Sequence, residues 1–88
     1  MNIENQNQRA RKERMMELAG ILKEKGKGSM TTLSKLLDKF AIQEGVRIVT
    51  AQEYLSLFKS VGLIKIAAGS KKWEYNEDAE WELFQINI

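Results

Sequence analysis

The sequence predicts a small α+β domain that is mainly α, with three helices, a two-stranded β-hairpin and a C-terminal element that we expect to be helical. Three observations predict this class. Apolar residues recur at helical spacing in three segments, and a glycine follows each segment. After the last of these glycines the apolar pattern changes to that of short strands. The chain has 88 residues, of which 43% are hydrophobic and 30% are charged, so it is long enough for one such domain and not for two.

The first helix is expected over residues 9–25, with Gly26 as its stop signal. Its apolar stripe is Met15, Leu18, Ala19 and Leu22. Residues 1–8 are polar and show no periodicity, so we expect a flexible N-terminal arm there and a single domain over residues 9–88.

The second helix is expected to open at Thr31 or Thr32, because a hydroxyl can cap the first free amides, and to end at Gly45. One buried face is predicted for it: Leu33, Leu36, Leu37, Phe40 and Ala41. Residues 46–49 are predicted to form a turn with buried side chains. The connection from Phe40 to Thr50 is then longer than a tight turn between two helices.

The third helix is expected to begin at Thr50, which forms a capping-box pattern with Glu53, and to end at Gly62. Its inward positions are Ala51, Tyr54, Leu55, Phe58 and Val61. Residues 63–67 and 72–75 are short and fit two strands of a hairpin.

The C-terminal segment begins like a capped helix, at Asn76 followed by Glu77 and Asp78. Three later residues fit one helical face: Trp81, Phe84 and Ile88. Trp81 and Leu83 also alternate as in a strand, but we favour the helix.

Three helices followed by a lysine-bearing hairpin, with the segment 50–64 that reads TAQEYLSLFKSVGLI, resemble the winged helix-turn-helix family. The resemblance covers about residues 30–76 and is to small transcription regulators of archaea and their viruses. It implies a double-stranded DNA-binding protein in which helix 50–61 enters the major groove and the wing, residues 66–73, lies on the backbone. It also implies a homodimer whose recognition helices meet half-sites about 34 Å apart.

The outward face of the third helix carries the candidates for base readout. Gln52, Ser56 and Lys59 share that face, and glutamine can bond an adenine edge in the major groove. A solvated helix face would show the same pattern, and the helix lacks the arginine that most often reads guanine. The candidates are Arg47, Thr50, Gln52, Ser56 and Lys59.

A second set of residues is suited to phosphates. Lysines at the wing tip can reach the backbone, although lysine also protects strand edges. A helix N-terminus with hydroxyls suits a phosphate, while capping alone accounts for at least one threonine. The basic cluster near residue 9 can follow a backbone or can be a solvated helix start. These candidates are Thr31, Thr32, Lys35, Ser70, Lys71, Lys72, Arg9, Arg11, Lys12 and Arg14.

The net charge of +2 conceals a split along the chain. Residues 1–72 hold all 14 Lys and Arg against seven acids, a balance of +7, whereas residues 73–88 hold five acids and no base, a balance of −5. This split indicates either an electropositive surface for an anionic partner or basic and acidic faces that meet within the fold or across a dimer.

The residues that are missing exclude several functions. Without cysteine or histidine, the chain has no disulfide, thiol nucleophile, imidazole base or common zinc site, so we expect no catalytic residues, no metal and no cofactor. No apolar run is long enough for a membrane span and no signal sequence is evident, so we expect a cytoplasmic, nucleoid-associated protein with no membrane partner.

Two functions therefore stay open: a DNA-binding regulator, and a winged-helix protein–protein interaction module that acts as an adaptor subunit through the acidic, aromatic C-terminal element. The C-terminal aromatics are interleaved with acids, so we expect core or dimer contacts from them rather than a stacking platform for single strands. They are Trp73, Tyr75, Trp81 and Phe84. A homodimer is expected because the first helix and the tail carry more apolar surface than the central domain can cover.

Overall fold

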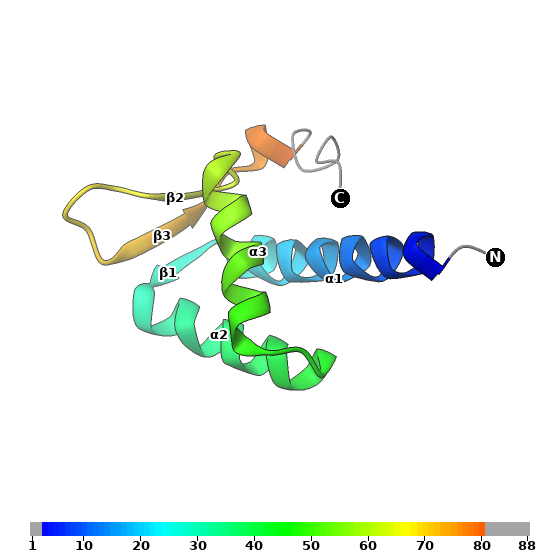
Figure 1. Cartoon of the computed structure of the whole chain (residues 1–88). Helices are drawn as coiled ribbons and strands as arrows, with labels where there is room; N and C mark the ends of the chain where they lie inside the picture. The colour runs from blue at the N-terminus through cyan, green and yellow to red at the C-terminus, as the bar shows by residue number, and fades with distance from the viewer. Residues whose placement is uncertain (1–2, 81–88) are drawn as a thin grey trace.

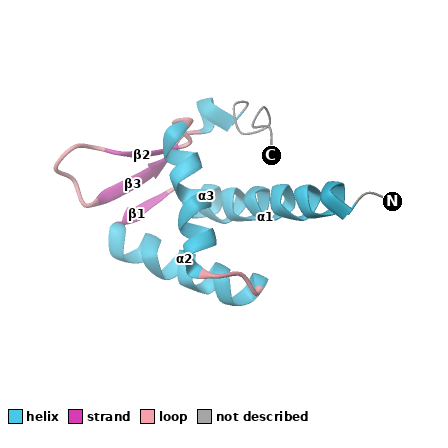
Figure 2. Cartoon of the chain, viewed as in Figure 1, coloured by secondary structure: helices cyan, strands magenta, loops and turns pink. Residues whose placement is uncertain are grey.

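The computed structural model describes the backbone of residues 3–80 and the side chains of residues 10–80. It contains three helices and three strands (Figures 1 and 2), and a single turn of 3-10 helix follows them. In chain order they are α1 (Ile3–Lys25), β1 (Lys27–Ser29), α2 (Met30–Glu44), α3 (Ile48–Ser60), β2 (Ile64–Ile66), β3 (Lys72–Tyr75) and η1 (Glu77–Ala79). The predicted class, a small and mainly helical α+β fold, is confirmed.

The sheet has three antiparallel strands in the order β1-β3-β2, with β3 in the middle. The hairpin of β2 and β3 was expected, whereas β1 corrects the expectation of a two-stranded sheet. A strand of three residues shows no period of its own, and Lys27–Ser29 is extended because it pairs with Lys72–Glu74 of β3. The Tyr75 N–H donates to the Gly26 carbonyl at 2.8 Å and closes this edge.

The first helix begins at Ile3 and not at residue 9, so residues 3–8 extend the helix that the sequence predicted. Those residues lack an apolar stripe, but they also lack glycine and proline. Extending an existing helix adds one hydrogen bond per residue, which costs far less than nucleating one. The helix therefore continues past its buried part, and its N-terminal half projects beyond the other elements (Figure 1).

The second helix is capped by Ser29, not by Thr31 or Thr32. The Thr32 N–H donates to Ser29 Oγ at 3.1 Å, and the two hydroxyl oxygens are 2.9 Å apart. The cap moves upstream because β1 already holds Ser29 in the extended conformation that an N-cap residue needs. The expected end at Gly45 is confirmed.

The third helix starts at Ile48 with Arg47 as its N-cap, so the capping box expected at Thr50 and Glu53 is wrong. The half-buried Val46 closes the turn, and its N–H donates to the Ala41 carbonyl at 3.0 Å. The connection between α2 and α3 is thus three residues long, 45–47, and not the long link that we expected. Ile48 and Val49 are exposed on the first helical turn instead of buried.

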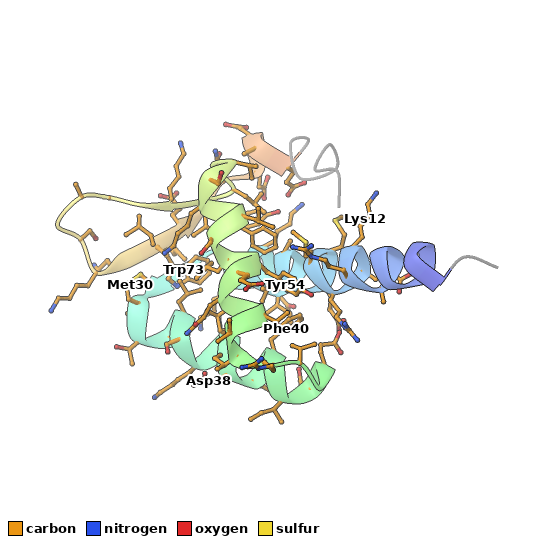
Figure 3. The ribbon with its side chains drawn as sticks, viewed as in Figure 1. Lys12, Met30, Asp38, Phe40, Tyr54 and Trp73 are labelled. Carbon is orange, nitrogen blue, oxygen red and sulfur yellow. The ribbon has the colours of Figure 1, made fainter. Side chains whose placement is uncertain are left out.

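The core forms where the three helices meet the inner face of the sheet. It contains Met15, Leu18, Ala19, Leu22, Leu33, Leu37, Phe40, Ala41, Ala51, Tyr54, Leu55, Phe58, Leu63, Ile64 and Trp73. The rings of Phe40 and Tyr54 meet edge to face at 6.4 Å, between α2 and α3 (Figure 3). The stripe of α1 is buried within the same chain, so this helix does not need the second subunit that we expected to cover it.

The predicted cap at Asn76 is confirmed, because its side-chain oxygen accepts from the Asp78 N–H at 3.3 Å. Beyond it, Glu80 Oε1 accepts from the Tyr75 hydroxyl at 3.0 Å and pairs with Lys23 Nζ at 2.7 Å. The Lys23 ammonium lowers the pKa of Glu80, whereas burial and the bond to Glu80 raise the pKa of Tyr75. Glu80, one of the five acids in residues 73–88, therefore pairs with the base Lys23 within the fold. The helical face expected at Trp81, Phe84 and Ile88 lies outside the described residues.

Substitution of two glycines by alanine is expected to have opposite effects on stability. Gly45 has φ +65° at the end of α2 and nothing within 4 Å of an added Cβ, so Gly45→Ala should lower the free energy of unfolding by about 1–2 kcal/mol through backbone strain alone. Gly20 lies inside α1 in open space, so Gly20→Ala should raise it by about 0.5–1 kcal/mol. Urea denaturation followed by circular dichroism measures both, and equal effects of the two substitutions would contradict the left-handed turn at Gly45.

Candidate nucleic-acid interface

The exposed face of α3 carries most of the residues predicted to read bases. Gln52, Ser56 and Lys59 are exposed, as expected, and the Ser56 hydroxyl donates to the Gln52 carbonyl at 3.1 Å. Thr50 is not on this face. It precedes Gln52 by two residues, which is about 200° around a helix, and its side chain is half-buried. The structure does not bring Thr50 to the face of Gln52, because α3 begins before Thr50 and turns it away.

A shallow groove of about 210 Å³ separates the exposed edges of α2 and α3. Apolar side chains form most of the α2 wall, and polar side chains of α3 form the opposite rim. The lining residues are Met30, Leu33, Ser34, Leu37, Gln52, Leu55, Ser56 and Lys59. Ser34 was not predicted as a site residue, because its place at the groove depends on how α2 lies against α3.

A larger cleft of about 960 Å³ lies between the C-terminal end of α3, the sheet and the wing. Four lysines line it, against one carboxylate from Glu74: Lys27, Lys59, Lys65 and Lys72. Two serines, Ser29 and Ser70, add hydroxyls to the same lining. Lys27 and Ser29 escaped prediction from the sequence because they belong to β1, the strand that was not predicted.

Lys59 lines both the groove and the cleft, which makes the two hollows one continuous surface. We call this surface the α3–wing face and define it by Gln52, Ser56, Lys59, Ser70 and Lys72. Its residues come from α3, from the turn between β2 and β3, and from β3. Five of the predicted base-reading and wing residues are therefore brought together on this face, whereas Arg47, Thr50 and Lys71 line neither hollow.

The N-terminus of α2 lies beside the wing. The Met30 N–H donates to the Lys71 carbonyl at 2.9 Å, so the first turn of α2 is attached to the wing turn. Thr31, Lys35 and Lys71 are exposed around this junction. The hydroxyls of Thr32 and Ser70 have local partners, since Thr32 meets Ser29 and Ser70 accepts from the Lys72 N–H at 3.2 Å.

The basic N-terminal cluster lies on the other side of α3. The Arg11 guanidinium is 6.0 Å from the centre of the Tyr54 ring, a cation–π contact. Tyr54 is buried and follows Gln52 by two residues, so it points to the opposite side of the helix. Lys12 extends from the projecting part of α1, far from the wing (Figures 1 and 3). Arg9 and Arg14 belong to the same segment of α1, so the structure does not bring this cluster to the α3–wing face.

The aromatic side chains of the described C-terminal region belong to the core, as expected. Trp73 is 1% exposed, and its Nε1 has no hydrogen-bond partner among the described residues. Gly28 of β1 lies against the indole, where an added Cβ would be 3.1 Å from Nε1. A buried ring cannot stack on a base, and Trp81 and Phe84 lie outside the described residues.

Two other kinds of feature, a metal site and a membrane span, are not found in the described part of the chain. The described side chains, those of residues 10–80, include no group of three or more acidic residues placed to hold a metal ion. No helix within residues 3–80 has the length and apolar character to cross a membrane. No family model, curated protein or solved structure matches the chain. The α3–wing face is thus the feature from which a function can be argued.

Proposed function

We propose that this chain is a winged-helix protein that binds double-stranded DNA, as a small transcription regulator. In this proposal α3 lies in the major groove, while the wing and the N-terminus of α2 contact phosphates. The observation that carries the proposal is the position of Lys59. It lies on the outward face of α3 and also lines the wing cleft, so one duplex placed against Gln52 also meets the wing lysines.

The link between α2 and α3 supports the same arrangement. A three- or four-residue turn that contains glycine joins the two helices of a helix-turn-helix unit, and here the link is 45–47 with Gly45 in a left-handed conformation. An α-helix fits the major groove, and α3 runs across α2 with its outer side uncovered by other described elements (Figure 1). The order of helices and strands is also consistent with a winged-helix layout.

The charge distribution of the face suits a polyanion. Lys27, Lys65 and Lys72 surround the cleft, and Thr31 with Lys35 follows at the start of α2. Each lysine that neutralises a phosphate releases a condensed counterion, so binding should weaken as salt rises. Arg47, the exposed N-cap of α3, adds a cation at the other end of the helix.

The homodimer stays part of the proposal, although the first helix no longer supports it. Since the apolar stripe of α1 is covered by its own chain, the expected homodimer now depends on the apolar residues of the tail, and Trp81 and Phe84 lie outside the described residues. Two copies related by a two-fold axis would place their α3 helices in half-sites about 34 Å apart.

The salt dependence of binding tests the proposed docking. Lys71→Ala and Lys72→Ala should weaken binding to all duplexes alike, and each should lower the slope of log affinity against log salt by about one unit for each phosphate that it no longer neutralises. Lys12→Ala is the matched control, because Lys12 lies on the projecting part of α1 away from the wing. It should leave the slope unchanged. Fluorescence anisotropy with a labelled random duplex measures all three.

Two outcomes of this titration would contradict the proposal at different levels. If the unmodified protein binds no duplex at micromolar concentration and low salt, the protein does not act on double-stranded DNA. If it binds, but the wing variants keep both affinity and slope, the hairpin is not on the DNA and the winged docking mode is wrong.

The adaptor module is the second candidate, and one observation favours it. Ile42 on α2 is 81% exposed, which is the kind of side chain that a protein partner covers. The absence of arginine from α3 points the same way, because arginine is the commonest reader of guanine. If the unmodified protein binds no duplex in the titration, the adaptor module becomes the better supported of the two functions.

A further inference from the structure

Two apolar side chains stand exposed on the first turn of α3, where the helix would otherwise be polar on its outer side. Ile48 is 38% exposed and Val49 is 47% exposed. The apolar residues that follow on the inward side of the helix are buried: Ala51, Tyr54, Leu55 and Phe58. The fold covers only part of these two β-branched side chains, and the apolar surface that it leaves in water would be stabilised by contact with something outside the chain.

The pair shares one face of α3 with the residues proposed to read bases. Ile48 precedes Gln52 by four residues and Val49 precedes it by three, and both spacings place side chains next to each other, about 5–6 Å apart at Cβ. Ser56 and Lys59 continue the same face toward the wing. The outer side of α3 is therefore apolar at its N-terminal end and polar further along.

We infer that Ile48 and Val49 contact thymine methyl groups, so that together with Gln52 they select A·T base pairs. This inference rests on the proposed function. In the major groove only thymine presents a methyl group, and apolar side chains recognise it by contact. Gln52 can bond N6 and N7 of adenine, which lie at the same edge of the same kind of base pair.

The apolar pair also acts against G·C pairs. Neither Ile48 nor Val49 has a polar atom in its side chain, so neither can bond the amino group of cytosine or the acceptors of guanine. Covering those groups with hydrocarbon would remove their water without replacing its hydrogen bonds, which is unfavourable. The same two side chains thus favour A·T and penalise G·C at the positions that they contact.

A nucleic-acid occupant is favoured over an apolar protein surface by the charges around the pair. Arg47 is exposed directly before Ile48, and Lys59 is exposed at the far end of the same face, so the face that holds the apolar pair carries a cation at each end against one exposed carboxylate, Glu53, a turn after Val49. Ile42, the other large apolar residue that is exposed among the described ones, is on α2 and does not belong to this face.

Replacement of thymine by deoxyuridine tests the inference, because it removes only the C5 methyl group and keeps every hydrogen-bonding atom. A duplex is first selected from a random pool with the unmodified protein and is then prepared with deoxyuridine at each thymine in turn. At a contacted thymine the affinity should fall about fourfold, which corresponds to about 0.8 kcal/mol for one buried carbon. The double variant Ile48→Ala/Val49→Ala should bind both duplexes equally. Ile42→Ala, an equally mild change of an exposed apolar residue on α2, should keep the difference.

The outcomes distinguish failure of the inference from failure of the proposed DNA-binding function. Binding without any difference between thymine and deoxyuridine, or a selected site made of G·C pairs only, overturns the inference and leaves DNA binding standing. A difference that persists in the double variant overturns the assignment to Ile48 and Val49. Absence of any duplex binding overturns both the proposed function and the inference. Thermal unfolding of each variant shows that the exposed substitutions leave the fold intact.

Discussion

Replacing Trp73 by alanine is expected to lower the free energy of unfolding by about 3–5 kcal/mol, the usual cost of removing a buried large aromatic side chain. Trp73 is 1% exposed, lies on the middle strand of the sheet and is among the largest fully buried side chains. Since small domains are stable by about 5–15 kcal/mol in total, this one substitution should remove much of the stability. Guanidinium denaturation followed by circular dichroism measures the decrease.

Two further variants make the Trp73 experiment specific. Lys72→Ala changes the exposed neighbour on the same strand and should alter stability little. Gly28→Ala keeps the indole but places a Cβ 3.1 Å from Nε1, so it should also destabilise the fold, by forcing β1 away from β3. If Trp73→Ala costs less than about 1 kcal/mol, the indole is not packed as the structure shows.

Replacing Gln52 by alanine is expected to relax base preference at one or two positions of the preferred site, by about 1–3 kcal/mol or roughly 5- to 150-fold in affinity. The physical reason is that the variant cannot form a bidentate bond to adenine, whereas the phosphate contacts made elsewhere remain. Affinity for duplexes without the site should therefore stay the same. Competition binding between the selected duplex and single-base variants measures the change.

The control for this experiment is a second glutamine. Gln43 is also exposed, but it lies nine residues after Ser34 of the α2–α3 groove, which is about 180° around the helix. Gln43→Ala should leave both affinity and preference unchanged. Equal effects of the two substitutions, or a uniform decrease for Gln52→Ala on all sequences, would show that Gln52 does not contact a base edge.

Periodic and strongly local signals in the sequence predicted the fold well, whereas helix starts were predicted poorly. The buried stripes of the three helices were predicted because 3.6-residue periodicity repeats several times along each of them. The stop at Gly45 and the hairpin strand at residues 72–75 were predicted from residues with strong local preferences. The start of α2 was misplaced because Ser29, Thr31 and Thr32 are all good caps and the chain needs only one of them.

The candidate site was predicted in part, because only the residues whose positions follow from helical periodicity could be placed. The outward positions of Gln52, Ser56 and Lys59 follow from the stripe on the opposite side of the helix. Thr50 was misplaced because its orientation depends on where the helix begins, and Ile48 and Val49 were expected to be buried because they are apolar. Burial is a property of the surroundings, and apolar side chains at a helix start point wherever the first turn directs them.

By itself, the sequence determined the helical segments, their buried faces, the hairpin and the excess of positive charge in the first 72 residues, because each of these depends on neighbours along the chain. Tertiary structure alone decided that Lys27–Ser29 is a strand, that Arg11 lies behind α3 on Tyr54, and that Lys59 joins the groove to the wing cleft. These depend on contacts between residues far apart in sequence. Such contacts form only when the core brings their elements together, and no local preference encodes them.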